Sequence, residues 1–180
     1  MIYVGLAGKK GSGKSTFALG MESHRKFASY AFADPLKEGL AKILGCSRAF
    51  LEQRHTREVP YKNYGKSPRQ MMQTLGTEWA RDHVHPDFWI LRAKQFVEEN
   101  QYPSLFGVIF TDVRFPNEAD FIRDELSGII VHIRRKSADA EEDLHPSESC
   151  SFLKEEDCVV HNEGNVKDLY EQARNLLDSF

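Results

Sequence analysis

Residues 8–15 of this 180-residue chain read Gly-Lys-Lys-Gly-Ser-Gly-Lys-Ser, a full match to the pattern G-x-x-x-x-G-K-[ST]. Its glycines allow successive backbone N–H groups to converge on phosphate oxygens, where a β-carbon would obstruct the approach. The stretch follows an apolar run at 2–7 that is typical of a buried strand, and it precedes a segment at 14–22 that can form a helix. A helix N-terminus favours a bound anion. The sequence therefore predicts a phosphate-binding loop that takes ATP or GTP.

The chemistry of such a loop assigns a role to its last residues. Lys14 reaches the β and γ phosphates, and Ser15 offers its hydroxyl to Mg²⁺. We expect the nucleotide to be held in addition by Gly8, Lys10, Gly11, Ser12 and Gly13.

Outside the loop, apolar runs alternate with segments of helical periodicity. The runs lie at 28–33, 107–111, 129–133 and 158–161, and the main helical segments at 36–44, 117–128 and 165–177. This alternation is typical of an α/β protein with a parallel sheet and right-handed crossovers. The stretch 45–100 reads as largely helical, and the charged stretch 134–157 as an excursion over the sheet. We expect a single domain over residues 1–180.

Acidic and basic residues follow two of the predicted strands. Asp34 comes after the second strand and Asp112 after the third, where an aspartate can hold a Mg²⁺ shell or orient a nucleophile. Lys37 and Arg114 lie shortly beyond them, and such cations suit the phosphate of a second substrate. Taken singly, each aspartate has a helix cap as its alternative role, and Lys37 a solvated helix face.

A second helix start lies at 67–70, where Ser-Pro-Arg-Gln forms a capping box with proline at the first helical position. One face of this helix is apolar and carries Met72, Leu75 and Trp79. Another face carries hydrogen-bond donors and acceptors that suit a nucleobase edge and a phosphate, namely Arg69, Gln73, Thr77 and Arg81. The alternative is that these four residues form a solvated face of the helix with no ligand. Gly76 costs about 1 kcal/mol relative to alanine in a helix, so we expect a ligand or another helix packed closely against it.

Composition excludes several classes of protein. The chain has 24 Lys and Arg against 27 Asp and Glu, a net charge of −3, so its overall field does not favour nucleic acid or anionic lipid. It contains no apolar run of the length that crosses a membrane. Its 3 cysteines form no C-x-x-C pair and read as free thiols in a reducing cytoplasm. Whether the chain forms a homodimer is left open.

Six further strings of the sequence are FADPLK at 32–37, SPRQ at 67–70, LGTEW at 75–79, TDVRFPNE at 111–118, HPSE at 145–148 and HNEG at 161–164. In this order, and over nearly the whole chain, they resemble the phage-type deoxynucleoside monophosphate kinases. The resemblance implies the three-layer P-loop NTPase fold, with a five-stranded parallel sheet, flanking helices, a helical acceptor-binding region over 45–100 and a short lid over 134–157. It also implies transfer of the γ-phosphoryl group of ATP, with Mg²⁺, to a (deoxy)nucleoside monophosphate.

The resemblance also implies site residues. The catalytic residues would be Lys14, Asp34, Asp112 and Arg114, and the metal ligands Ser15 and Asp112. The monophosphate would be bound by Asp34, Lys37, Arg69, Gln70, Gln73, Trp79, Arg114 and Glu118. For Glu118, as for Glu148, the alternative role is to brace arginines. The ATP site would include Thr16, Arg134, Asn162 and Gly164.

The excursion departs from the usual lid of such kinases, because only Arg134 and Arg135 are available to close on the transferred phosphate, and acidic residues follow them. Two alternative functions stay open. One is another small-molecule P-loop kinase, such as dephospho-coenzyme A kinase, which shares the phosphate loop and an aspartate after the second strand. The other is a nucleotide-gated binding or assembly ATPase, which the lack of a basic stripe disfavours.

Overall fold

The structure, a computed structural model, describes residues 1–53, 55–139 and 152–180. The chain divides into two compact units, which we describe separately. The first unit contains Met1–Ala31 and Gln95–Phe180, and the second contains Phe32–Lys94. Compared with the helical region predicted over 45–100, the second unit begins earlier in the chain and therefore includes the helix that follows the second strand.

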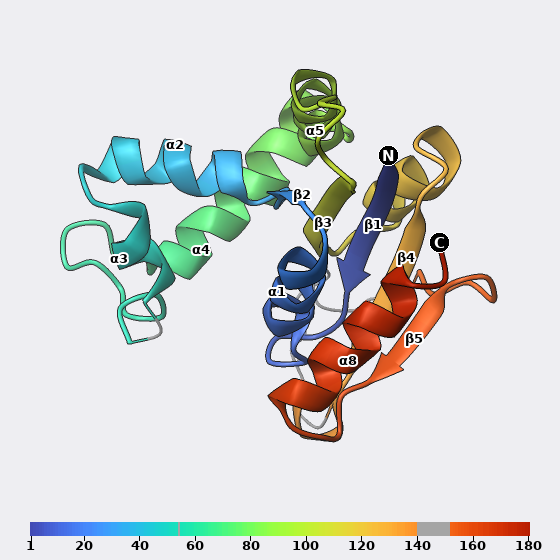
Figure 1. The fold of residues 1–180 in the computed structure, drawn as a ribbon. Helices are drawn as coiled ribbons and strands as arrows, with labels where there is room; N and C mark the ends of the chain where they lie inside the picture. Colours follow the sequence, from blue (N-terminus) through green and yellow to red (C-terminus); the bar gives the residue numbers. More distant parts are fainter. Residues whose placement is uncertain (54, 140–151) are drawn as a thin grey trace. The chain divides into compact units, whose positions relative to one another are not determined.

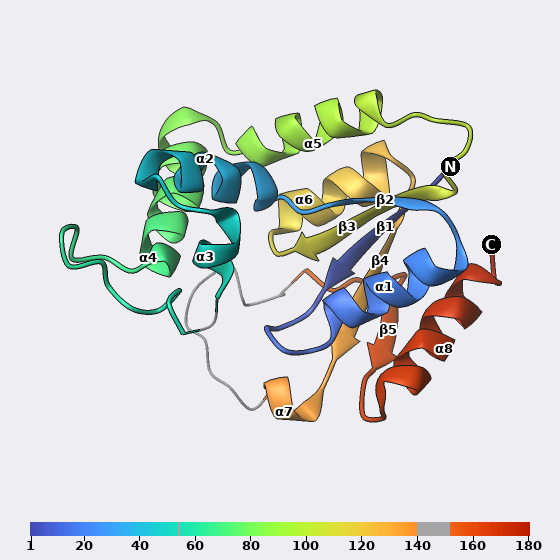
Figure 2. The same ribbon diagram turned by 60° about the vertical axis from the view of Figure 1, so that its left-hand side comes forward.

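The first unit contains a sheet of five strands in the order β2-β3-β1-β4-β5 (Figures 1 and 2). The strands are β1 (Ile2–Ala7), β2 (Phe27–Tyr30), β3 (Gly107–Val113), β4 (Ile129–Arg134) and β5 (Cys158–His161). Every neighbouring pair is parallel, which confirms the predicted α/β class and five-stranded parallel sheet.

One strand is longer than its apolar run. β3 was predicted over 107–111, but it continues to Val113, which is buried and pairs with Ala7 of β1. Asp112 therefore lies inside the strand instead of after it. The reason is that the strand's hydrogen-bonded ladder extends past the half-buried polar residues at 111 and 112.

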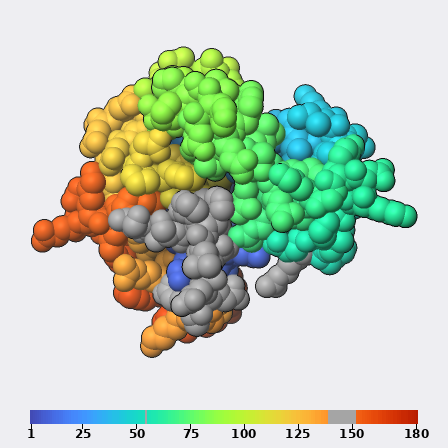
Figure 3. Space-filling model, turned by 180° about the vertical axis from the view of Figure 1, so that it is seen from behind, coloured from blue at the N-terminus to red at the C-terminus, as the bar shows by residue number. Residues whose placement is uncertain are grey.

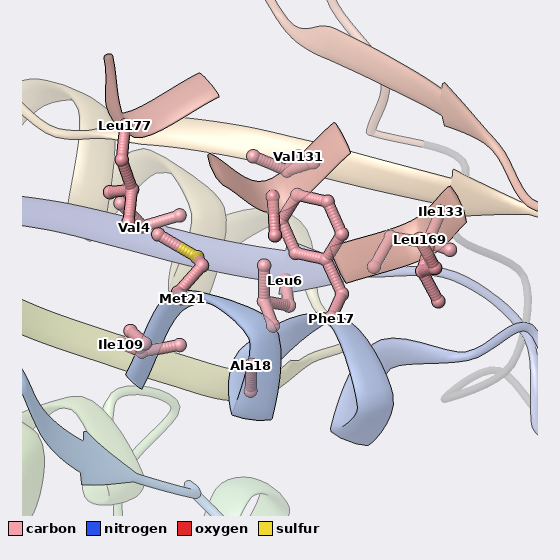
Figure 4. Close-up of a cluster of buried hydrophobic side chains, with 11 residues drawn as sticks. Val4, Leu6, Phe17, Ala18, Met21, Ile109, Val131, Ile133, Leu169 and Leu177 are labelled. Carbon is pink, nitrogen blue, oxygen red and sulfur yellow. The ribbon is translucent and has the colours of Figure 1, made fainter. Parts of the chain in front are cut away.

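Helices cover both faces of this sheet. They are α1 (Lys14–His24), α6 (Pro116–Asp120), the π-helix η2 (Phe121–Glu125) and α8 (Val166–Leu177), while the four-residue α7 (Lys136–Asp139) follows the end of β4. Val4 and Leu6 of β1 point toward α1 and α8, where they pack with Phe17 and Leu169 in a fully apolar cluster (Figure 4). Because side chains alternate along a strand, the residue between them faces the other way.

That residue is Gly5, and the opposite face is covered by η2. A β-carbon at Gly5 would contact the side chain of Ile122 on η2, so glycine allows this helix to approach the sheet. From the side opposite to Figure 1, the surface formed by α6 and η2 comes into view in yellow (Figure 3). The sheet is thus the middle of three layers, as the predicted fold requires.

The second unit is helical. Its elements are α2 (Asp34–Leu44), α3 (Arg48–Glu52), α4 (Pro68–Gln73), the π-helix η1 (Thr74–Val84) and the first part of α5 (Phe88–Glu99). Its core is formed by Leu40, Ala41 and Leu51, against which Met72 and Leu75 pack. The predicted capping box at the start of α4 is present.

The apolar stripe predicted for this helix is wrong at Trp79, which is 48% exposed and forms a T-shaped ring pair with Phe88, with the centroids 5.5 Å apart. The segment from Thr74 is a π-helix, whose i→i+5 hydrogen bonds change the angle between successive side chains, so the spacing of an α-helical face is lost. Gly76 has the predicted close neighbour: a β-carbon there would lie 3.0 Å from Leu36 of α2.

Within the described ranges, no helix is both long and apolar enough to cross a membrane. Cys46 and Cys158 are free thiols, while Cys150 falls outside the described residues.

Candidate active site

The phosphate loop lies at the carboxyl end of β1, between β1 and α1. In the sheet β1 stands between β3 and β4. The connection that follows β1 runs to β2 on one side, whereas the connection that follows its neighbour β3 runs to β4 on the other side. Parallel α/β sheets bind their ligands outside the carboxyl ends of the strands, at such a reversal of strand order. The fold therefore places residues 8–15 where a ligand site is expected.

Two glycines of the loop are required by their surroundings. Gly8 has φ +138° and Gly13 has φ +109°, both in the region that L side chains rarely adopt. A β-carbon on Gly8 would collide with the carbonyl oxygen of Ile133, and one on Gly13 would collide with the side-chain amide of Asn162. At these two positions the loop therefore lies directly against the ends of β4 and β5, with no room for a β-carbon.

The ammonium group of Lys14 is held over this loop. Its Nζ donates hydrogen bonds to the carbonyl oxygens of Gly8, at 2.5 Å, and Lys9, at 2.9 Å. The side chain is only half-buried, so the cation lies at the surface of the loop. It is positioned to meet a phosphate that the loop N–H groups bind.

A cavity of about 510 Å³ opens beside the loop. Many of the residues predicted to hold ATP line it: Gly11, Gly13, Lys14, Ser15, Thr16, Asn162 and Gly164. Three lining residues were not predicted, namely Asn165, Val166 and Leu169 at the start of α8. The amphipathic pattern of this helix is visible in the sequence, but nothing local shows that its first turn faces a loop some 150 residues earlier.

Other predicted ATP residues lie elsewhere. Ser12 is completely buried, Lys10 is exposed, and neither lines the cavity. Arg135 lines the cavity and Arg134 does not. Arg134 is the last residue of β4, and its carbonyl oxygen accepts a hydrogen bond from the backbone N–H of Asn162, at 2.8 Å. The chain leaves the strand directly after it, so the next residue supplies the arginine at the cavity.

Asp112 and Arg114 lie at the carboxyl end of β3, the strand beside β1, and both side chains are half-buried. Glu118 does not face solvent as a substrate ligand would: it is 2% exposed, and its Oε2 accepts hydrogen bonds from the backbone N–H groups of Arg114, at 2.8 Å, and Phe115, at 3.2 Å. Glu118 thus braces the turn that carries Arg114.

In the second unit, Asp34 and Lys37 belong to an ion-pair network that the sequence did not reveal. Arg48 pairs with Asp34 through Nη2 and with Glu52 through Nε, at 3.2 Å, while Lys37 Nζ lies 3.0 Å from Glu52. Burial disfavours the charged carboxylate of Glu52, but the hydrogen bonds and charges of Lys37 and Arg48 outweigh it, and the pKa of Glu52 lies below its ordinary value. Arg48 and Glu52 carry no motif, so only folding brings them to Asp34.

The remaining predicted acceptor residues differ in their surroundings. Arg69 pairs with Glu58, at 3.2 Å. Gln70 uses its side chain to accept from the backbone N–H of Ser67, at 2.9 Å, in the capping box, so its role here is in the helix start. Gln73 is half-buried and Trp79 exposed.

The predicted site residues thus fall into two groups. The phosphate loop, Asp112, Arg114, Glu118, Asn162 and Gly164 belong to the first unit, and Asp34, Lys37, Arg69, Gln70, Gln73 and Trp79 to the second. Of the predicted lid over 134–157, residues 140–151, including His145 and Glu148, lie outside the described residues.

Comparison with solved structures supports the fold. TT1252 from Thermus thermophilus covers 99% of this chain and 97% of its own length with a TM-score of 0.54, and dephospho-CoA kinase from Campylobacter jejuni covers 98% and 95% with a TM-score of 0.52. Both are 16% identical in sequence, so the likeness concerns the fold alone.

Comparison of sequences shows the family. A putative deoxynucleotide monophosphate kinase of Acanthamoeba polyphaga mimivirus is 32% identical over 192 residues, covering 99% of this chain and 97% of that protein. The deoxynucleoside-5'-monophosphate kinase of Escherichia phage T5 is 26% identical over 217 residues, covering 82% and 84%. The family profile described as deoxynucleotide monophosphate kinase matches residues 46–173. Since the profile spans most of the chain and the mimivirus relative nearly all of it, the chain belongs to the deoxynucleotide monophosphate kinase family.

Proposed function

We propose that this enzyme transfers the γ-phosphoryl group of ATP to the phosphate of a deoxynucleoside monophosphate, giving ADP and the deoxynucleoside diphosphate. The observation that carries this proposal is the phosphate loop with Lys14 held over it, beside a cavity of about 510 Å³, in a chain of this kinase family. The names of the mimivirus and phage T5 relatives support the same acceptor class.

The donor nucleotide would bind in the cavity of the first unit. Lys14, Ser15 and Thr16 would hold its phosphates together with the loop N–H groups. Val166 and Leu169 provide an apolar wall that suits an adenine ring. Arg135, in place of Arg134, would add a positive charge near the phosphates, while Asn162 and Gly164 would lie at the edge of the adenine.

Catalysis of phosphoryl transfer mainly requires the protein to hold the donor and acceptor phosphates in line and to neutralise their negative charge. The acceptor is already a phosphate oxyanion, so no strong general base is required. Lys14 would neutralise charge on the transferred group, and Asp112 and Arg114 would act at the carboxyl end of β3. In the second unit, Asp34, Lys37 and Arg69 are proposed to contact the acceptor, with Gln73 and Trp79 beside the nucleoside.

The available oxygen ligands fit Mg²⁺. This ion usually binds one or two protein oxygens and completes its shell with waters and substrate phosphates. Ser15 presents an exposed hydroxyl in the first turn of α1, and Asp112 a carboxylate at the end of the neighbouring strand β3. Among the described residues there is no group of three or more His, Cys, Asp or Glu that would form an all-protein metal site. When bound, Mg²⁺ would neutralise phosphate charge during transfer.

The free thiols of Cys46 and Cys158 lead us to propose a cytoplasmic enzyme. The weakly acidic composition and the absence of a basic stripe lead us to propose that its partners are small nucleotides and not nucleic acid.

An acceptor screen tests the proposal directly. The purified chain is incubated with ATP and Mg²⁺ and with each deoxy- and ribonucleoside monophosphate in turn, and ADP release is measured. Dephospho-coenzyme A serves as a further acceptor. We expect ADP release that depends on at least one deoxynucleoside monophosphate.

A Lys14→Ala variant is the matched control, and we expect its kcat/KM to fall on the order of 10³-fold, about 4 kcal/mol of transition-state stabilisation. Turnover of dephospho-coenzyme A alone, or hydrolysis of ATP that no monophosphate stimulates, would refute the proposed function.

A further inference from the structure

In the second unit, two arginines and one carboxylate meet where α4 begins. Glu58 Oε1 lies 3.2 Å from Nη1 of Arg69 and 3.8 Å from Nε of Arg57. The two arginines are also joined through the backbone, since the N–H of Arg69 donates to the carbonyl oxygen of Arg57, at 3.1 Å. Two guanidinium groups from different segments therefore approach the same carboxylate oxygen.

The three side chains differ in how firmly they are held. The side chains of Arg69 and Arg57 are 18% and 29% exposed, whereas that of Glu58 is 48% exposed. Arg69 lies next to the buried capping residue Ser67, which fixes the backbone at this end of the helix. The arginines are thus the better-fixed part of the cluster, and solvent reaches the carboxylate.

A carboxylate and a phosphate are recognised by guanidinium groups through the same planar arrangement of N–H donors, and a phosphate monoester carries more charge. An incoming phosphate can therefore replace the carboxylate on the two arginines. As long as the carboxylate stays in place, it competes with that phosphate for the same donors and repels it.

We propose that Glu58 occupies the position of the acceptor's phosphate between Arg57 and Arg69, and that the substrate displaces it. This inference rests on the proposed function and deepens it. It makes Arg57 a phosphate ligand that no sequence motif indicates, and it makes Glu58 the residue that limits affinity for the monophosphate.

The test uses the full chain with Glu58→Gln, which keeps the shape of the side chain and removes its charge. Because an exposed ion pair contributes at most about 1 kcal/mol, we expect the KM for the best acceptor of the screen to fall by about 2- to 5-fold, with the KM for ATP unchanged. We expect the difference to shrink at high ionic strength, since salt screens exposed charges. Arg57→Met should raise the KM for the acceptor by about tenfold.

Asp82→Asn is the matched control, because it removes one exposed carboxylate of the same unit at a distance in sequence from the cluster, and its acceptor KM should equal that of the parent. A higher acceptor KM in Glu58→Gln would mean that Glu58 holds the arginines in place, and an unchanged one would mean that it does not compete. Either result overturns the inference, as does an unchanged acceptor KM in Arg57→Met.

A second measurement separates this inference from the proposed function. Binding of inorganic phosphate is followed by calorimetry in the parent chain and in Glu58→Gln, without any turnover. Tighter phosphate binding in the variant supports the inference even if the screen finds no monophosphate acceptor, and equal or weaker binding counts against it.

Discussion

Asn162 is the side chain that ties the end of β5 to the phosphate loop. It is 7% exposed, and its Nδ2 donates a hydrogen bond of 2.8 Å to the carbonyl oxygen of Ser12. If this hydrogen bond were lost, the buried carbonyl oxygen of Ser12 would have no donor, which would lower the stability of the folded loop by about 1–3 kcal/mol. The loop is thus held in its phosphate-binding shape by a residue far away in the sequence.

We predict that Asn162→Asp raises the KM for ATP about tenfold, which corresponds to roughly 1.4 kcal/mol, and leaves the KM for the acceptor unchanged. The substitution removes the donor to Ser12 and adds a negative charge beside the cavity. Steady-state kinetics with each substrate varied in turn measures both constants.

The control is Asn175→Asp, the same change at an exposed position of α8. If Asn162→Asp raised both KM values by the same factor and also lowered the unfolding midpoint, its effect would be a general loss of structure and not a specific effect on the loop.

At the start of α4, the capping box consists of two reciprocal hydrogen bonds between Ser67 and Gln70. The hydroxyl of Ser67 accepts from the backbone N–H of Gln70, at 3.3 Å, and the Gln70 side chain accepts from the N–H of Ser67, at 2.9 Å. Ser67 is 3% exposed, so water cannot replace it readily. This helix start fixes the backbone next to Arg69.

We predict that Ser67→Ala lowers the free energy of unfolding by about 1 kcal/mol. Urea titration followed by tryptophan fluorescence measures the change. Ser104→Ala, at an exposed position in a turn, should stay within about 0.5 kcal/mol of the parent. An unfolding midpoint for Ser67→Ala equal to that of Ser104→Ala would show that the cap does not stabilise the helix.

The helix that continues from this cap shows where reasoning from sequence fails. Its start is encoded by four adjacent residues, and the strands of the sheet are encoded by short apolar runs, so both could be predicted. The change to a π-helix at Thr74 could not, because the same residue types fit both forms and packing decides between them. The exposure of Trp79 and the change of its helical face follow from that choice.

The stability of the whole chain should depend on pH through a buried cluster in the first unit. Asp157 accepts hydrogen bonds from Arg123 Nε, at 2.9 Å, and from His132 Nε2, at 3.1 Å, and the side chains of all three are at most 7% exposed. Burial lowers the pKa of His132 below its ordinary value, aided by the charges of Arg123 and Arg134 and opposed by that of Asp157. The histidine is therefore neutral in the folded chain at pH 7.

The direction in which stability changes with pH follows from comparing protonation of His132 in the unfolded and the folded chain. An unfolded histidine takes up a proton near pH 6.5, whereas folded His132 does so only at lower pH, so the unfolded state binds more protons in between. The contribution of neutral, buried His132 to the free energy of unfolding is therefore complete above about pH 6.5. It is lost as the pH falls through the pKa of His132 in the folded chain. Burial disfavours the charged carboxylate of Asp157, but its hydrogen bonds and the charges of Arg123 and His132 outweigh burial, and its pKa lies below the ordinary value. The stability that this carboxylate contributes is therefore complete above about pH 4 and is lost only at lower pH, outside the range tested.

We predict that the free energy of unfolding decreases between pH 7 and pH 5, and that His132→Gln makes this decrease smaller. Urea unfolding at the two pH values measures it. His55→Gln, at an exposed position, is the control and should keep the slope of the parent. A slope for His132→Gln as steep as that of the parent would assign the pH dependence to other groups.

Features that are encoded by a few consecutive residues could be predicted from the sequence: the phosphate loop, the five strands, the capping box and the family strings. Each depends on local spacing, on backbone freedom or on hydrogen bonds between near neighbours. Contacts between separate segments of the chain could not be predicted from the sequence. Examples are the contacts of Asn162 with Ser12, of Arg48 with Asp34 and of Arg69 with Glu58. Such pairs carry no common spacing, because the packing of the sheet and of the helical unit, and not the order of residues, brings their atoms within hydrogen-bond distance.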